Sequence, residues 1–189
     1  MTIEHTSRTG KTYYLHMGTT KTGKPKYFFS MKQDGERVAS IPDGFEIYEN
    51  VDGQVFLRRI PKQIIKPDEL ALVETALKAH GEAWEYRAEV KKNAITVYEC
   101  GTDIGGISDM IKAYAGRSWT DAERRKHAHY MAIMRFVLED KDARLFITER
   151  FCFKGSIDDW IFVDGPADLA DQVGQYIKHL GQESFYDLF

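Results

Sequence analysis

The segment KPDELALVETALKAHG (Lys66–Gly81) carries the clearest helix signal in the sequence and decides the fold class. Pro67 suits the first helical position, and Asp68 and Glu69 complement the positive end of the helix dipole. Apolar residues recur at helical spacing, and a glycine ends the pattern. The segment therefore predicts one helix with one apolar face.

The residues after this helix alternate between strand and helix patterns. AWEYRAEV (83–90) and AITVYEC (94–100) flank a Lys-Lys-Asn turn and predict a hairpin. The capping box Thr120–Glu123 predicts the start of a long helix that runs to about Glu139. The remaining residues predict two strands and a closing helix: Arg144–Phe153, Trp160–Val163 and a helix from Pro166.

The residues before the helix predict a β-rich module. Runs of β-prone residues separated by Gly, Pro and Asp predict a four-stranded antiparallel sheet over 13–17, 27–31, 45–49 and 54–58. Alternation along the first run puts Tyr13, Leu15 and Met17 on one face of that sheet. Tyr14 and His16 belong to the other face.

Together these elements predict an α+β protein with antiparallel hairpins and three to four helices. We expect two parts, a β-rich N-terminal module over 1–66 and an α+β body over 67–189. At 189 residues the chain has room for a substantial core without metals or disulfides. It has no apolar run long enough to span a bilayer, and its two cysteines have no disulfide spacing. These features predict a cytoplasmic protein that does not enter a membrane.

Charge is unevenly distributed along the chain. The net charge is −3, but residues 1–66 carry 11 Lys and Arg against 7 Asp and Glu. Residues 140–189 carry 5 against 10. This polarity favours an anionic partner for the N-terminal end.

The stretch KTYYLHMGTTKTGKPKYFFSMK (Lys11–Lys32) combines five lysines with five aromatic rings. Proteins hold single-stranded nucleic acid by stacking bases on rings and pairing phosphates with cations. This pattern predicts a DNA- or RNA-binding surface made of Lys11, Tyr14, His16, Lys21, Lys24, Lys26 and Phe28. The alternative is an amphipathic hairpin whose rings are buried and whose lysines are solvated.

A second basic group, Arg124, Arg125 and Lys126, follows the predicted capping box. A short helical pattern and a tight connection precede it, as in helix-turn-helix proteins that place such a segment in a DNA groove. The alternative is a solvated helix face.

An enzyme is the alternative to a non-catalytic binding protein. Glu89 and Lys91 have the spacing of an acid and a lysine in metal-dependent nucleases, and Glu99 on the next strand is a candidate second acid. The histidines and cysteines lack metal-ligand spacing, so we expect no structural zinc site and no cofactor. A third hypothesis is an accessory subunit that binds another protein through its aromatic tail, ESFYDLF (183–189).

Glu149 is an anomaly in the strand pattern. It shares a predicted strand face with Leu145, Ile147, Phe151 and Phe153. A carboxylate in such a place is costly unless it is paired. We therefore predict a structural ion pair between Glu149 and an arginine of another strand.

Two stretches resemble a family of uncharacterised, hypothetical bacterial proteins. They are YYLHMGTTKTGKPKYFF together with IPDGFEIYENVDGQVFLRR, and RFCFKGSIDDWI together with YIKHLGQESFYDL. The resemblance implies a bacterial, cytoplasmic protein, and it implies no activity and no site residues.

Overall fold

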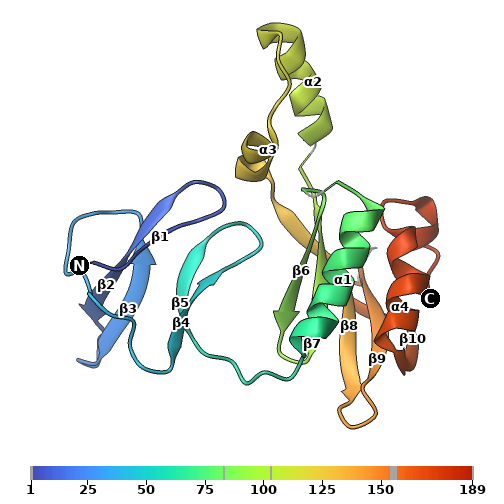
Figure 1. Cartoon of the computed structure of the whole chain (residues 1–189), viewed down its shortest axis with the longest axis horizontal. Coiled ribbons are helices and arrows are strands. Elements are labelled where there is room, and N and C mark those ends of the chain that lie inside the picture. Colours follow the sequence, from blue (N-terminus) through green and yellow to red (C-terminus); the bar gives the residue numbers. More distant parts are fainter. Residues whose placement is uncertain (1, 83, 103, 154–156, 189) are drawn as a thin grey trace. The chain divides into compact units, whose positions relative to one another are not determined.

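The computed structural model describes residues 2–82, 84–102, 104–153 and 157–188. Within them the chain has the α+β architecture that the sequence predicts, with strands in antiparallel sheets (Figure 1). No helix of these residues is long and apolar enough to cross a membrane.

The chain divides into two compact units. The first comprises Met1–Lys62 and Ile104–Ala128, and the second comprises Gln63–Asp103 and His129–Phe189. The sequence predicts a single boundary near residue 66. The units differ from that division because the segment 104–128 interrupts the second unit and groups with the first.

The second unit is built on an antiparallel sheet, here called the body sheet, in which each strand pairs with the next along the chain. Its strands are β6 (Tyr86–Lys91), β7 (Ala94–Cys100), β8 (Tyr130–Asp140), β9 (Leu145–Cys152) and β10 (Asp159–Asp168). The predicted hairpin is therefore confirmed as β6 and β7. The two predicted strands after residue 143 are confirmed as β9 and β10.

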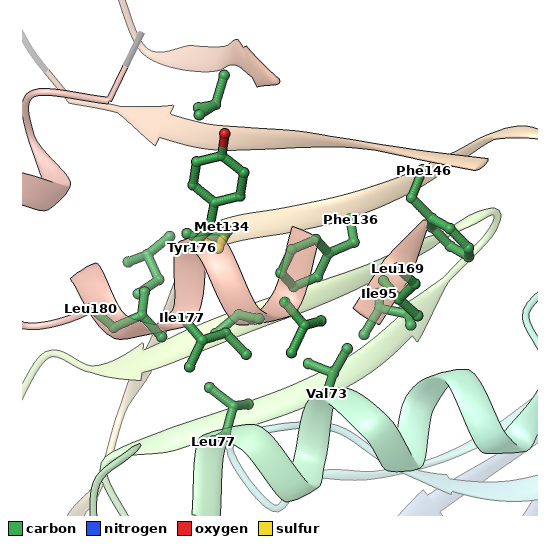
Figure 2. Packing of buried hydrophobic residues seen from close by; sticks show 14 of the residues in the cluster. Val73, Leu77, Ile95, Met134, Phe136, Phe146, Leu169, Tyr176, Ile177 and Leu180 are labelled. Carbon is green, nitrogen blue, oxygen red and sulfur yellow. The ribbon is translucent and has the colours of Figure 1, made fainter. Parts of the chain in front are cut away.

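Two helices pack on one face of the body sheet, α1 (Pro67–His80) and α4 (Leu169–Tyr176) (Figure 1). α1 confirms the helix prediction, with Pro67 in its first turn and Gly81 at its C-terminal cap. Figure 2 shows the apolar side chains of the two helices meeting those of the strands. The buried core includes Val73, Leu77, Ile95, Met134, Phe136, Phe146, Leu169, Tyr176, Ile177 and Leu180.

The prediction of a long helix from Thr120 to about Glu139 is wrong beyond its first two turns. The capping box is present, with the Thr120 hydroxyl accepting from the Glu123 backbone N–H, but α3 spans only Asp121–His127. The residues from Tyr130 onward form β8, the central strand of the body sheet. β8 carries apolar residues on both its buried face and its partly exposed face, and such a nearly continuous apolar run matches helical spacing as well as strand spacing.

The predicted start of the last helix is also wrong. Pro166 lies in β10, and α4 begins after Asp168, whose side chain accepts a hydrogen bond from the Ala170 backbone N–H at 2.8 Å. An aspartate at the cap satisfies a free helical N–H and so competes with proline as a start signal. The predicted buried residues of this helix, including Leu169 and Val173, are confirmed.

The N-terminal residues form two small sheets rather than the predicted four-stranded one. β1 (Glu4–Thr6), β2 (Thr12–Thr19) and β3 (Pro25–Ser30) make the N-terminal sheet, and β4 (Phe45–Glu49) pairs only with β5 (Val55–Arg59). β1 takes the sheet edge at the start of β2. This strand has only three residues, EHT, and a segment this short and polar cannot be recognised as a strand from sequence.

Candidate nucleic-acid interface

The N-terminal sheet places part of the predicted set on one face. In the register of β2 and β3, Tyr14 lies opposite Ser30, His16 opposite Phe28, and Gly18 opposite Lys26. A single bridge pairs His16 with Arg37 on the other side of β2. Because neighbours across an antiparallel pair share a face, these side chains lie on the same side of the sheet. We call Tyr14, Lys26, Phe28 and Arg37 the basic aromatic face.

The opposite face of the same sheet is directed into the first unit. Leu15 is fully buried there, and Tyr13 and Met17 are partly buried, as alternation predicts. Phe29 and Tyr27 lie opposite Leu15 and Met17 on β3. β3 also contacts β5, so the two small sheets pack against each other. Three of the five aromatic rings of the Lys11–Lys32 stretch, those of Tyr13, Tyr27 and Phe29, therefore face the interior of the first unit.

Phe28 is the ring that the sheet leaves accessible, with 40% of its surface exposed. It lies across Gly18, where a β-carbon would come 3.4 Å from the ring, so a glycine in the strand makes room for it. The His16 ring stacks beside it at 5.6 Å between centroids. The Lys26 ammonium lies 5.9 Å from the Phe28 centroid. An exposed ring beside a cation is the arrangement that holds a stacked base next to its phosphate.

His16 belongs to the interior rather than to the accessible surface. It is 3% exposed, and its Nε2 lies 3.0 Å from the Lys32 carbonyl oxygen. The loop of residues 31–37 folds back over it. Gly35 lies close to the His16 ring, and a β-carbon at this position would lie 3.3 Å from His16 Nδ1. The backbone φ of +112° at Gly35 also favours glycine. His16 therefore anchors this loop.

Tyr14 is half-buried and committed to the same loop. Its hydroxyl accepts a hydrogen bond from Gln33 Nε2 at 2.9 Å, and the Arg37 guanidinium lies 5.2 Å from its ring centroid. Arg37 also donates from Nε to the Gln33 carbonyl at 2.8 Å. Sequence reasoning missed Arg37 because only the return of the loop to β2 brings it beside Tyr14.

The predicted lysines outside this face are exposed. Lys21 and Lys24 lie in the turn between β2 and β3, where the Thr20 hydroxyl accepts from the Lys24 backbone N–H at 3.0 Å. Lys11 precedes β2 and is exposed as well. Asp34 and Glu36 are exposed on the covering loop and partly offset the positive charge.

The second basic group lies on α3. Arg124 and Lys126 belong to this helix, and the side chain of Arg125 is outside the described part of the structure. α3 has seven residues and is followed by a strand, whereas a recognition helix continues along the groove. At its start, Arg117 pairs with Glu123 at 2.8 Å, and this bond together with those from Thr120 lowers the pKa of Glu123 to about 2.

The residues of the nuclease alternative do not converge. Glu89 and Lys91 share a face of β6, with the ammonium 3.9 Å from the carboxylate. Glu99 lies opposite Tyr86 on the face that packs on the helices, and its carboxylate accepts from the Tyr86 hydroxyl at 3.2 Å. Burial, with the neighbouring Glu99 carboxylate, raises the pKa of Tyr86. Among the described residues, no group of three His, Cys, Asp or Glu side chains is arranged to hold a metal ion.

The predicted ion pair of Glu149 is confirmed. Glu149 lies directly opposite Arg135 on the neighbouring strand β8, and Arg135 Nε donates to its carboxylate at 2.5 Å. The Glu149 side chain is 18% exposed. Sequence pattern alone thus located a largely buried carboxylate and the type of its partner.

The aromatic tail docks largely on its own unit. Phe185 joins the core, and Leu188 packs against it. Arg150, a buried residue of β9, donates to the carbonyl oxygens of Leu188 at 2.8 Å and Tyr186 at 3.1 Å. Of the described tail rings, Tyr186 is the exposed one.

Comparison with known proteins adds no family. No family model, no curated protein and no solved structure matches this chain. Function is therefore inferred from the geometry and chemistry of the chain itself.

Proposed function

We propose that the protein is a non-catalytic binding protein that holds single-stranded nucleic acid on the basic aromatic face of its N-terminal sheet. One observation carries the proposal: an exposed ring, Phe28, lies on β3, an edge strand of the N-terminal sheet, with the Lys26 ammonium 5.9 Å from its ring centroid. Single-strand binders combine such a ring with cations that follow the backbone.

The surroundings of Phe28 support the same chemistry. Arg37 lies on the same face, and the turn that follows β2 carries Lys21 and Lys24. A base on Phe28 would leave its phosphates within reach of these flexible cations. A single strand is favoured over a duplex because stacking on a ring requires an unpaired base.

Replacing Phe28 with alanine tests whether a base stacks on the Phe28 ring. Loss of one base–ring stack costs about 1–3 kcal/mol, so the affinity for a labelled single-stranded oligonucleotide should fall by about 5- to 150-fold. The measurement is a fluorescence anisotropy titration at low salt with single-stranded DNA, single-stranded RNA and duplex DNA. Tyr14→Ala is a poorer probe because it also removes the contacts of Tyr14 with Gln33 and Arg37.

Phe162→Ala is the matched control for this experiment. Phe162 is 55% exposed on β10 in the second unit, so the substitution removes a similar exposed ring that lies outside the basic aromatic face. It should leave oligonucleotide affinity unchanged. If the unaltered protein binds none of the three nucleic acids at low salt, or if both variants lose the same affinity, the proposal fails.

A further inference from the structure

The second unit carries a pocket on the face of the body sheet opposite α1 and α4. It measures about 570 Å³. In the strand register, Glu89 lies opposite Thr96, Thr96 opposite Arg135, and Arg135 opposite Glu149. Since Glu149 and Arg135 alternate with residues of the helix-covered core, this row runs across the other face.

Small side chains make the hollow. Ala94, Thr96, Ala132 and Val137 form its floor on β7 and β8. Larger rings rise around them, namely Tyr98, Phe151 and Trp160. Phe151 and Trp160 meet edge to face at 5.2 Å, which fixes both rings. A slot with a small-residue floor and aromatic walls fits a planar ring, and its volume lies in the range of small-molecule sites.

The slot and its border carry three cations and two carboxylates, because Arg135 pairs with Glu149 and the Lys91 ammonium lies 3.9 Å from Glu89, and their charges sum to a positive value. Lys91 and Lys92 line it from the β6–β7 turn, and Arg135 lines it from the centre of the sheet. The Arg135 guanidinium lies 4.3 Å from the Trp160 ring, and the Lys91 ammonium lies 5.0 Å from the Tyr98 ring. These two cations lie beside the rings that a cationic ligand would contact, so they would repel such a ligand. An anionic group would find lysine donors at the rim.

We propose that this pocket binds a small planar aromatic ligand that carries a carboxylate or phosphate group. The ring lies over the alanine floor between Tyr98 and Trp160, and the anion lies at Lys91 and Lys92. A free nucleotide and an aromatic carboxylic acid share this chemistry. The pocket shares no residue with the basic aromatic face, so ligand binding here is independent of nucleic-acid binding at the N-terminal sheet.

Calorimetric titration of the full chain tests the ligand class. The probes are adenosine monophosphate and naphthoate, each compared with its uncharged counterpart, adenosine and naphthylmethanol, and with inorganic phosphate. We expect at least one charged aromatic probe to bind, and its uncharged counterpart and phosphate to bind about tenfold more weakly or less. Preference for the nucleotide or for the carboxylate identifies the source. Absence of binding by both charged probes, or equal binding by the uncharged ones or by phosphate, overturns the proposal.

Two kinds of variant test whether the ligand binds in this pocket. Ala132→Phe fills the floor without changing charge and should abolish binding of the charged probe. Lys91→Gln with Lys92→Asn removes the rim cations and should weaken it about tenfold; asparagine suits the φ of +57° at Lys92. The control pair Lys78→Gln with Lys141→Gln removes two exposed lysines elsewhere and should bind normally.

The rim variant keeps the test decisive if the filled variant does not fold. Thermal unfolding followed by circular dichroism establishes folding for each protein. Unchanged probe affinity in the folded rim variant contradicts the proposed place. Oligonucleotide binding should persist in that variant, which separates this site from the one on the N-terminal sheet.

Discussion

Phe136→Ala is expected to lower the free energy of unfolding by about 3–5 kcal/mol, because it removes a large ring from a fully buried site. Phe136 is completely buried in β8, opposite Ile95 on one neighbouring strand and Thr148 on the other. Figure 2 shows its ring among the side chains of α1 and α4. Few neighbouring atoms can move to fill the space, since the strands on both sides of β8 are held in the sheet by their hydrogen bonds.

Urea unfolding followed by far-ultraviolet circular dichroism measures this loss. Phe162→Ala is again the control, because that ring is more than half exposed and should cost about 1 kcal/mol or less. Equal effects of the two substitutions would contradict the assignment of β8 as the central, buried strand. That result would favour the helix that the sequence pattern predicts for these residues.

Glu149→Leu is expected to cost about 2 kcal/mol, below the 3–5 kcal/mol of a fully buried pair because both partners keep some solvent contact. The substitution leaves Arg135 without its carboxylate, 4.3 Å from the Trp160 ring. Removing both charges together, with Arg135→Met and Glu149→Leu, should cost less than the sum of the single changes. A double-mutant cycle by urea unfolding measures the difference.

Additive losses in this cycle would contradict an energetic coupling between the two side chains. The pair Arg58 and Glu46 provides a comparison on β4 and β5, where the distance is 2.8 Å but both side chains are more than a third exposed. Its cycle should give a coupling below about 1 kcal/mol, because solvent screens exposed pairs.

Local signals predicted most of the elements of the second unit. The Pro67 start and the Gly81 end of α1, and the alternation of β6, act within a few residues and do not depend on distant contacts. Glu149 was recognisable because one carboxylate in an apolar alternation is costly without a partner. β8 could not be recognised, since apolar residues on both of its faces remove the alternation that distinguishes a strand from a helix.

The candidate interface was predictable only in part. Alternation correctly grouped Tyr14 with His16, and the register adds Lys26 and Phe28 to that face. No local signal shows that residues 31–37 return to cover His16 and bring Arg37 beside Tyr14. Such closure is a long-range event set by hydrogen bonds between segments about twenty residues apart, including the one from His16 to Lys32.

The salt dependence of oligonucleotide binding tests the central claim most directly. Each phosphate neutralised by the protein releases condensed counterions, so binding to a single strand should weaken linearly on a log–log plot against salt concentration. Replacing Lys21, Lys24 and Lys26 with alanine should reduce that slope by about 2, at about 0.7 per lost phosphate contact. The control replaces Lys78, Lys141 and Lys178, three exposed lysines of the second unit, and changes the net charge equally. A reduced slope in the first variant alone is the predicted result; equal slopes in both variants and the unaltered protein would contradict nucleic-acid binding at the N-terminal sheet.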